Sequence, residues 1–339
     1  MNTSFPAYVV RQDEQGRVHA AIEQLRKEDL PNGDVSVHVQ YSSVNYKDGL
    51  AAAEKGGVVR HYPMVPGIDI AGVVEESVSG RFAPGDRVIS TGYEPGVSHF
   101  GGFSRYARLS SEWLVPLPPG LSEKEAMAIG TAGFTAALSV DALLHAGVKP
   151  AMGPVLVTGA TGGVGSMAVA ILSRLGFEVT ASTGKKAEQE PLLKRLGAAH
   201  VISREEADAP AKGALGKQLW AGIVDPTAGA GLAERLKHVR YGGAAAVSGL
   251  TGGPSFESSV FPFILRGVQL IGIDSVYCPM ERRERIWKLL GGEWKPERAL
   301  ELGIQEISWA QLPQTLETIL KGGAVGRSVL NTMTEPPVE

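Results

Sequence analysis

Short apolar runs separated by turns occupy the first part of the chain. Residues 35–39 alternate between apolar and polar positions, and the runs at 72–74 and 85–89 follow Pro-Gly turns. Short strands with frequent turn signals are typical of a small irregular β-barrel. We therefore expect a barrel that ends at the stiff Pro-Leu-Pro-Pro-Gly connector of residues 116–120.

From residue 126 onward the pattern changes to strands that alternate with helices. Ser122 and Glu125 have capping-box spacing at the start of a helix, and Gly176 and Gly197 each follow a helical segment. The alternation implies an α/β fold with a doubly wound parallel sheet. The expected strands are 155–158, 178–182, 200–202, 223–225, 244–247 and 270–273, and the expected helices are 167–175 and 188–196.

The end of the chain is expected to return to the first domain. A charged helix is predicted at 281–290 and a last strand at 328–330. The predicted division is therefore a first domain of residues 1–125 together with 278–339, and a second domain of residues 126–277.

Charge and cysteine content exclude several classes of protein. A net charge of −3 gives no general attraction to nucleic acid or anionic lipid. The single cysteine, Cys278, excludes an internal disulfide and a cysteine zinc cluster. Residues 1–8 lack the basic and apolar pattern of a secretion signal, so we expect a cytoplasmic protein. The uncharged stretch 150–173 has membrane-span length, but its glycines and its strand-turn-helix pattern favour a nucleotide site instead.

The strongest motif follows the predicted strand at 155–158. Ala160-x-Gly162-x-x-Gly165 is the dinucleotide fingerprint with alanine in the first place. Such a turn lets the backbone approach a pyrophosphate, and the helix N-terminus then offers free N–H groups to the anion. A merely tight structural turn is the alternative. The candidate pyrophosphate contacts are Ala160, Thr161, Gly162, Gly163, Val164 and Gly165.

The end of the next strand indicates which dinucleotide binds. Ser182, Thr183, Gly184 and Lys185 stand where NAD sites place an acid that holds the ribose hydroxyls. Hydroxyl and ammonium groups attract a 2′-phosphate, and Arg204 follows the third strand as a further cation. A solvated basic turn is the alternative interpretation. We expect NADP as the coenzyme.

Together with motifs of the first domain, this pattern resembles the medium-chain dehydrogenase/reductase superfamily. More narrowly, the chain is similar to the YhdH/YhfP branch of quinone oxidoreductases, which includes acrylyl-CoA reductases. The resemblance covers nearly the whole chain. It rests on residues 45–49, 66–72, 85–88, 130–136, 248–253, 262–267 and 272–276.

The resemblance implies a GroES-like catalytic domain, a Rossmann NADP-binding domain and a homodimer. It assigns coenzyme contacts outside the fingerprint to Tyr46, Thr183, Gly184, Lys185, Arg204, Leu250, Ile264, Ser275 and Arg327. Thr131 has two interpretations, a hydrogen bond to the nicotinamide carboxamide or a role in helix packing. One departure is Lys185, because the family often has arginine there, and lysine lacks the planar fork of arginine.

The resemblance also implies that no metal binds. Zinc enzymes of the superfamily carry a cysteine in the loop that here contains Asn45, a histidine in the motif that here reads Gly67-Ile68-Asp69, and a cysteine at Gly130 or Thr131. At these three positions the chain has no cysteine or histidine, so it lacks the ligands that zinc requires there. The seven histidines are scattered along the sequence and are interpreted as surface or structural residues.

Without a Lewis acid, hydride addition to an activated C=C bond makes smaller demands than alcohol oxidation. Tyr46 is the candidate donor to the enolate oxygen, and Asn45 is the candidate polar anchor. The alternatives are packing for Tyr46 and a turn role for Asn45. Lys47 and Asp48 are expected to form a local ion pair or to cap the following turn, with a role in proton transfer as the alternative. Asp69 is expected to be structural.

These features predict an NADPH-dependent oxidoreductase that reduces a small conjugated carbonyl compound. The predicted substrate is acrylyl-CoA or a related enoyl thioester, and a quinone or simple enone is the alternative. A non-catalytic binding or structural protein is the remote alternative. Contacts to the phosphates of coenzyme A are assigned to Arg60, His61, Arg105 and Arg108, with ordinary surface charge as the competing interpretation.

Overall fold

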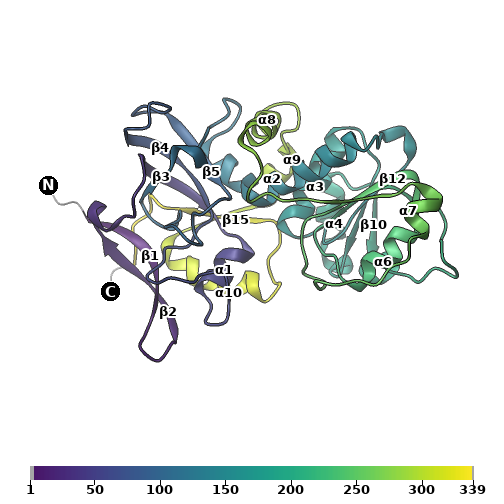
Figure 1. Ribbon diagram of the computed structural model, residues 1–339, viewed down its shortest axis with the longest axis horizontal. Coiled ribbons are helices and arrows are strands. Elements are labelled where there is room, and N and C mark those ends of the chain that lie inside the picture. The colour runs from purple at the N-terminus through teal and green to yellow at the C-terminus, as the bar shows by residue number, and fades with distance from the viewer. Residues whose placement is uncertain (1–3, 338–339) are drawn as a thin grey trace. The chain divides into compact units, whose positions relative to one another are not determined.

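The computed structural model describes residues 4–337 and divides the chain into two compact units, each built around its own sheet (Figure 1). The first unit contains the chain as far as Thr131, then Val276–Gly291 and the chain from Ile304 onward. The second unit contains Ala132–Ser275 and Gly292–Gly303. The sequence assigned residues 292–303 to the first domain. They pack in the second because Arg174 bonds to the carbonyl of Glu293 (2.6 Å) and pairs with Glu297 (2.7 Å).

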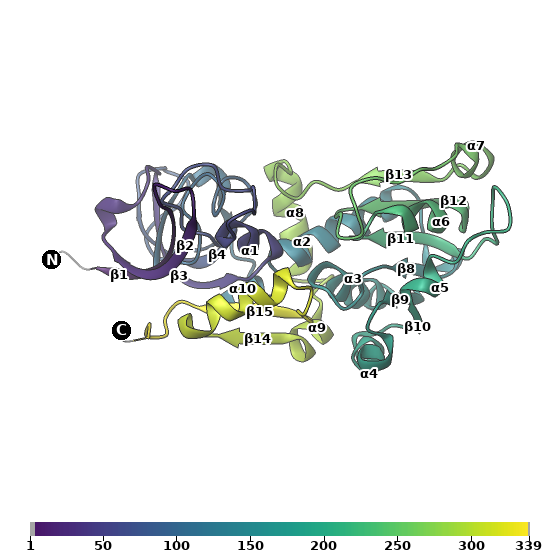
Figure 2. The same cartoon turned by 90° about the horizontal axis from the view of Figure 1, so that it is seen from below.

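The second unit contains the predicted parallel sheet. Its six strands lie in the order β10-β9-β8-β11-β12-β13, an order that Figure 2 shows clearly. Every pair of neighbouring strands is parallel. This is the doubly wound order. Successive strands are added on one side of β8 as far as β10, and from β11 onward they are added on its other side. The strands are β8 Val155–Val157, β9 Val179–Thr183, β10 His200–Ser203, β11 Trp220–Asp225, β12 Val239–Val247 and β13 Gln269–Gly272.

Helices connect these strands, and the core forms between helix and sheet. Leu156 and Ile223 of adjacent strands pack against Leu232 and Leu236 of α6. The predicted glycine stop after α4 is confirmed, because Gly197 has a φ of 115° that L side chains rarely adopt. Helix α2 Glu123–His145 begins in the first unit and enters the second at Ala132, six residues after the predicted boundary at residue 126. The other helical segments of the second unit are η3 Pro150–Met152, α3 Gly163–Arg174, α4 Lys186–Leu196, α5 Arg204–Ala207, α6 Ala230–Lys237, α7 Phe261–Arg266 and α9 Glu297–Leu302.

The first unit has a mixed sheet in the order β14-β15-β3-β4-β5-β7, to which β6 adds by pairing with β3. The register between β3 and β4 shifts twice, so this sheet is bulged and irregular, as the short apolar runs predicted. The hairpin β1–β2 and strands β6, β7 and β14 were not predicted. The strands are β1 Phe5–Gln12, β2 Val18–Leu25, β3 Val35–Ser43, β4 Asp69–Ser77, β5 Arg87–Thr91, β6 Tyr106–Leu109, β7 Val115–Pro116, β14 Ile304–Ile307 and β15 Arg327–Asn331.

Alternating side chains of β3 form one core of this unit. Val35, Val37 and Val39 are fully buried and pack with Ile70 and Val88. A second core lies under the hairpin and includes Trp309 and Leu316. The helical segments of this unit are η1 Lys27–Asp29, α1 Tyr46–Ala52, η2 Ser111–Trp113, α8 Met280–Leu290, η4 Trp309–Gln311 and α10 Leu312–Leu320.

Helix α2 begins at the predicted capping box, where Ser122 Oγ donates to Glu125 and accepts from its N–H. The helix is interrupted at Gly130, whose φ of 51° and ψ of −162° are not helical. In the described part of the chain, α2 is the one helix with the length and composition of a membrane span, and 89% of that apolar window is buried. The burial of α2 in the fold accounts for its apolar character.

Candidate active site

The loop before α1 carries the candidate catalytic residues. Asn45 stands at the N-cap of α1 and is buried, whereas Tyr46 begins the helix and is 48% exposed. The exposed ring of Tyr46 is the observation that keeps it available to a ligand. The alternative for Tyr46, ordinary packing at the seam between the two domains, stays open beside the catalytic interpretation.

Asn45 is held from both ends of its amide. Its Nδ2 donates to Asp69 Oδ2 (2.9 Å), and its Oδ1 accepts from Arg327 Nη2 (3.1 Å). Asp69 and Arg327 are both buried, at 0% and 4% exposure. Because both polar ends have a partner, Asn45 fixes the start of α1 more effectively than a simple turn residue.

Thr131 belongs to the same network. Its N–H donates to Asp69 Oδ2 (2.8 Å) and its hydroxyl donates to Asp69 Oδ1 (2.5 Å). The Thr131 hydroxyl therefore donates its proton to Asp69. To donate instead to a nicotinamide carboxamide, as one of its two interpretations requires, the hydroxyl would have to give up this hydrogen bond. We call Asn45, Asp48, Asp69, Thr131 and Arg327 the buried polar cluster.

Asp48 completes the buried polar cluster. Its carboxylate accepts hydrogen bonds from the N–H groups of Asn45 (2.8 Å), Gly67 (3.0 Å) and Ile68 (2.9 Å). Of the two roles expected for Asp48, a local ion pair or a cap, the structure shows the cap, and the carboxylate is fully buried. Burial and the nearby Asp69 raise the pKa of Asp48 to about 7, against the effect of the three N–H donors.

Arg327 is the cation of the buried polar cluster. Besides Asn45, it donates from Nε to the carbonyl of Ala128 (3.0 Å) and from Nη1 to that of Val44 (3.4 Å). Burial lowers the pKa of Arg327, and the negative charges of Asp69 and Asp48 oppose this effect. The positive charge of the Arg327 guanidinium thus offsets the negative charges of two carboxyl groups within a buried site.

In the second unit, the dinucleotide motif adopts the predicted strand-turn-helix geometry. Gly159 has a φ of 52°, and α3 begins at Gly163 directly after the turn. A Cβ on Gly165 would lie 2.3 Å from the carbonyl oxygen of Gly159, so only glycine permits this close packing. Ala160 is fully buried, and its N–H bonds to the carbonyl of Ser182 on β9 (3.0 Å).

Polar groups and cations gather at the end of β9. Thr183 Oγ1 lies 3.2 Å from Thr161 Oγ1 and accepts from the N–H of Lys185 (3.1 Å). The Arg204 guanidinium lies over Gly184, because a Cβ there would be 3.0 Å from Arg204 Nη2. The neighbouring Lys186 instead pairs with Glu206 (2.9 Å).

The parallel sheet collects most of the predicted coenzyme residues at one edge. Leu250 follows the carboxyl end of β12 and Ser275 follows that of β13, the edge that also carries the fingerprint turn. Ile264 is not grouped with them. It lies on α7 near Arg266, which bonds to the carbonyl of Val239 at the amino end of β12 (3.1 Å).

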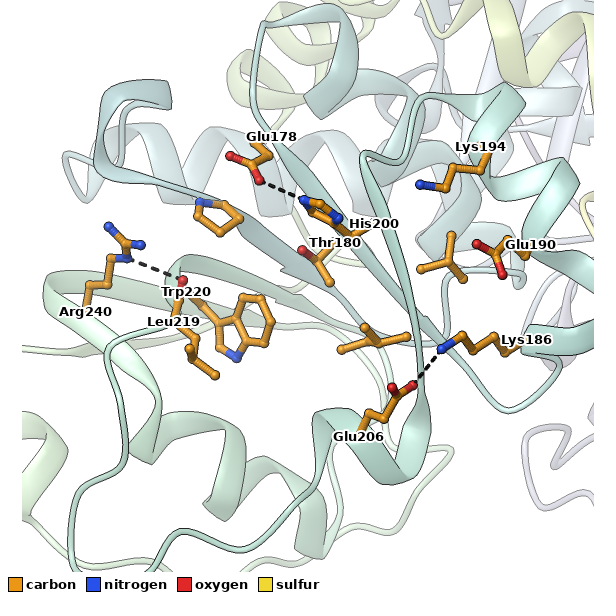
Figure 3. Close-up of a pocket in the computed structure, with 13 residues that line it drawn as sticks. Glu178, Thr180, Lys186, Glu190, Lys194, His200, Glu206, Leu219, Trp220 and Arg240 are labelled. Carbon is orange, nitrogen blue, oxygen red and sulfur yellow. Dashed lines mark hydrogen bonds and ion pairs between the residues drawn. The ribbon is translucent and has the colours of Figure 1, made fainter.

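A hollow crosses β9 and β10 of the second unit (Figure 3). Its charged side chains largely satisfy one another, as in the pairs Glu178–His200 (3.0 Å) and Lys186–Glu206 (2.9 Å). Its rim residue His200 stands at the amino end of β10, opposite the edge that carries the fingerprint turn. We assign no ligand to this hollow.

Comparison with known proteins places the chain in a family. The description "Alcohol dehydrogenase GroES-like domain" matches residues 31–119, and "Zinc-binding dehydrogenase" matches residues 163–291. The chain is 49% identical to the putative quinone oxidoreductase YhfP of Bacillus subtilis over 97% of this chain and 99% of that protein. It is also 49% identical to the acrylyl-CoA reductase AcuI of Ruegeria pomeroyi, over 96% of this chain and 99% of that protein. The chain belongs to the medium-chain dehydrogenase/reductase superfamily.

Within this superfamily the chain falls in the YhfP, YhdH and AcuI branch, as the resemblance predicted. The yhdH oxidoreductase of Salmonella enterica, solved in complex with NADP, matches with a TM-score of 0.92 and 44% identity, covering 96% of this chain and 99% of that one. Bacillus subtilis YhfP, solved with NAD bound, matches with a TM-score of 0.94 and 49% identity, covering 97% and 99%. The GroES-like and Rossmann folds are therefore confirmed.

Gly130 lies directly beside the buried polar cluster. A Cβ on Gly130 would lie 2.3 Å from Ser43 Oγ and 2.6 Å from Asp69 Oδ2, so a cysteine there would disrupt the cluster. Over residues 4–337, no group of three or more His, Cys, Asp or Glu side chains has an arrangement suited to a metal ion. From the sequence we expected Asp69 to be structural and did not connect it with Asn45. The available signal was its place directly after Ile68, which stands where zinc enzymes have a histidine.

Asp48 generates a prediction about pH. Its pKa in the folded protein, about 7, is above the ordinary value of 3.8, so the folded state binds the extra proton and stability falls as pH rises between these values. Relative to Asp48→Asn, the wild-type protein should lose on the order of 2 kcal/mol of unfolding free energy between pH 5 and pH 8. Urea denaturation of both proteins at several pH values measures the difference.

The comparison with Asp48→Asn removes the effect of other titrating groups. Burial lowers the pKa of His38 and His99, which destabilises both proteins at low pH and cancels in the difference. Parallel pH curves for the two proteins would show that Asp48 ionises at its ordinary pKa.

Proposed function

We propose that this protein is an NADPH-dependent oxidoreductase that reduces the C=C bond of a small conjugated carbonyl compound, with acrylyl-CoA or a related enoyl thioester as substrate. The 49% identity to an acrylyl-CoA reductase along nearly the whole of both chains carries the proposal. The dinucleotide turn of the second unit and the buried polar cluster of the first unit support it, because hydride transfer to an activated alkene needs a coenzyme and hydrogen-bond donors.

The residues of the second unit fit the coenzyme. Four of the seven residues from Gly159 to Gly165 are glycines, so the backbone can approach a pyrophosphate closely, and the first amides of α3 are available to an anion. Thr183, Lys185 and Arg204 offer a hydroxyl and two cations to a 2′-phosphate. When bound, NADPH supplies the hydride for the reaction.

The residues of the first unit supply orientation and hydrogen bonding. The hydroxyl of Tyr46 donates to the carbonyl oxygen of the substrate and stabilises the negative charge that develops there. Asn45 holds the start of α1 in place through Asp69 and Arg327 and is thus a positioning residue for Tyr46. Thr131 and Arg327 act through the same network, and this assignment replaces a direct role of Asn45 as substrate anchor.

Of the four basic residues assigned to coenzyme A phosphates, two are already engaged. Arg105 donates to the carbonyls of Thr332 and Thr334, and Arg108 donates to that of Lys27. Arg60 and His61 are exposed in the loop between α1 and β4. These two residues are therefore the better candidates to bind the phosphates of the coenzyme A part of the substrate.

Reduction of a quinone at the same site is the second candidate, because YhfP is named as a putative quinone oxidoreductase. Steady-state oxidation of NADPH with acrylyl-CoA, crotonyl-CoA and a benzoquinone in parallel separates the two functions. A higher kcat/KM for a CoA thioester supports the proposal, and a higher value for benzoquinone contradicts it. The cytoplasmic location expected from the sequence stays a prediction.

Coenzyme choice can be tested at the end of β9. Arg204→Ala and Lys185→Ala should each raise KM for NADPH about tenfold or more, because a hydrogen bond to a charged group contributes about 1.5–3 kcal/mol. KM for NADH should stay unchanged. Lys186→Ala is the matched control, since Lys186 pairs with Glu206 and should leave the NADPH to NADH preference intact. Equal effects on both coenzymes would contradict this assignment.

Phosphate recognition at the substrate end is tested by Arg60→Ala. Loss of one exposed phosphate contact should raise KM for acrylyl-CoA about twofold to fivefold, since an exposed ion pair contributes up to about 1 kcal/mol. KM for benzoquinone should not change. Arg17→Ala removes an equally exposed arginine from the turn of the β1–β2 hairpin and serves as the control. An unchanged KM for the thioester would remove Arg60 from the substrate site.

We also propose that the protein forms a homodimer through β13. This strand is the outer edge of the second unit's sheet, and exposed apolar side chains surround it. Phe261, Ile264 and Leu265 are 42%, 68% and 55% exposed on α7, and Leu270 is 39% exposed on β13 itself. An unpaired edge with exposed apolar residues favours pairing with a second copy.

The dimer prediction is tested by sedimentation at micromolar concentration. The wild-type protein should sediment at twice the chain mass of 35.7 kDa. Leu270→Lys should sediment as a monomer, because a charge in the paired edge is costly to desolvate. Val78→Lys, at a position 89% exposed in the first unit, is the control and should remain a dimer. A monomeric wild-type protein contradicts the proposal.

A further inference from the structure

A second buried charge cluster lies beside the dinucleotide turn. Asp225 ends β11 with 0% exposure, and Arg235 of α6 is 3% exposed. Asp225 Oδ1 accepts from the hydroxyls of Thr158 (2.7 Å) and Thr227 (2.7 Å). It also accepts from the N–H groups of Thr227 (2.9 Å) and Ala228 (3.0 Å). One carboxylate thus joins the turn after β8 to the turn after β11.

Arg235 extends this connection to a third segment. Its Nη1 lies 3.2 Å from Asp225 Oδ2 and donates to Thr227 Oγ1 (2.8 Å), while its Nη2 donates to the carbonyl of Ala228 (2.9 Å). Its Nε lies 3.2 Å from Asp208 Oδ1 in the loop after α5. A Cβ on Gly231 would lie 2.3 Å from that carboxylate, so the helix leaves room for Asp208.

The turn that these side chains hold is strained and touches the fingerprint. Ala228 has a φ of 50°, in the left-handed region that a non-glycine residue rarely adopts. A Cβ on Gly159 would lie 3.0 Å from Thr227 Cγ2, so the turn packs directly against the first glycine of the fingerprint segment. Thr158, which Asp225 anchors, immediately precedes Gly159.

Stability alone does not explain why the charges of Asp225 and Arg235 are buried. A buried ion pair seldom stabilises a fold more than apolar residues of the same volume, but it fixes geometry because each charge requires its partners. Apart from the contact between the two side chains, the hydrogen bonds of Asp225 Oδ1 and of Arg235 Nη1 and Nη2 go to residues of the turns after β8 and β11, so these bonds require the observed conformation of both turns. The geometry fixed in this way is that of the backbone at Gly159.

We propose that Asp225 and Arg235 are positioning residues for the coenzyme, which hold the turn after β8 in the conformation that binds the pyrophosphate. The inference rests on the proposed NADPH-dependent function. Neither side chain is exposed to the coenzyme, and both act through Thr158, Thr227 and the backbone at Gly159. The pyrophosphate is common to NADPH and NADH, so the network affects both coenzymes alike and leaves the 2′-phosphate contacts intact.

The experiment measures dissociation constants of NADPH and NADH, the inhibition constant of adenosine 2′-monophosphate, and kcat at saturating NADPH. The variants are Asp225→Asn, Arg235→Met and the milder Thr227→Val, which removes one hydroxyl and keeps the side-chain shape. Ser139→Ala is the matched control, because it removes a buried hydroxyl bonded within α2 of the same unit (2.8 Å). Circular dichroism and urea denaturation report folding for each variant.

The expected result is a rise of about tenfold or more in the dissociation constants of both NADPH and NADH for Asp225→Asn and Arg235→Met, and about threefold for Thr227→Val. Their ratio, the inhibition constant of adenosine 2′-monophosphate and kcat should stay within about twofold of wild type, as should every constant of Ser139→Ala. If the two charge variants do not fold, Thr227→Val decides the question alone.

Two results overturn the inference. One is unchanged coenzyme affinity in folded Thr227→Val and Arg235→Met. The other is a parallel loss of adenosine 2′-monophosphate binding, which would indicate a general structural role in the second unit. A wild-type protein that binds neither coenzyme overturns the proposed function and this inference together, whereas wild-type binding with unaffected variants overturns the inference alone.

Discussion

A charge buried without a partner costs several kcal/mol, and this constraint organises both units of the protein. Arg327 in the first unit and Arg235 in the second are almost fully buried. Arg235 pairs with Asp208 and Asp225. Arg327 instead donates to Asn45, which in turn donates to the buried Asp69. Each arginine also bonds to backbone carbonyls of neighbouring segments. Segments that are distant in sequence are thereby fixed at the places where chemistry and coenzyme binding are proposed.

In the first unit this constraint fixes the loop before α1. Gly130 has a left-handed backbone, and the space beside it is filled by Asp69 and the groups that donate to it. The hydrogen bonds of Asn45 and Thr131 to Asp69 order this loop. The proposed addition of hydride to an activated alkene requires a hydrogen-bond donor at the carbonyl oxygen, and Tyr46 at the start of α1 is the proposed donor.

In the second unit, strand direction decides where the coenzyme residues gather. Parallel strands end at one edge of the sheet, so the fingerprint turn and the segment from Thr183 to Lys185 become neighbours although β9 and β8 are separated by a helix. The close approach of Arg204 to Gly184 adds the third strand to this site. Coenzyme geometry and coenzyme selectivity thus depend on different residues at one sheet edge.

The sequence by itself determined the features that depend on local pattern. The parallel strands, the fingerprint turn at Gly159–Gly165 and the cations near β9 were all predicted, because a strand-turn-helix motif and a missing acid are visible within a short segment. The hairpin β1–β2 was not predicted, although side chains of β2 alternate between less and more exposed positions. The pairing of Phe5–Gln12 with Val18–Leu25 is a contact between two segments, and the sequence of either segment alone does not indicate it. The domain assignment of residues 292–303 depended on contacts with Arg174 that no local pattern contains.

Only the tertiary structure decided how the buried charges are satisfied. Asp69 bonds to Asn45 and Thr131, Arg327 bonds to Asn45 across 282 residues, and Asp225 bonds to Thr158 across 67 residues. The positive φ of Ala228 is likewise decided by the surrounding structure, because an alanine rarely adopts it by its own preference. Burial and hydrogen bonding are properties of the assembled chain, and for this reason a sequence can indicate which chemistry is available but not which polar groups will meet to perform it.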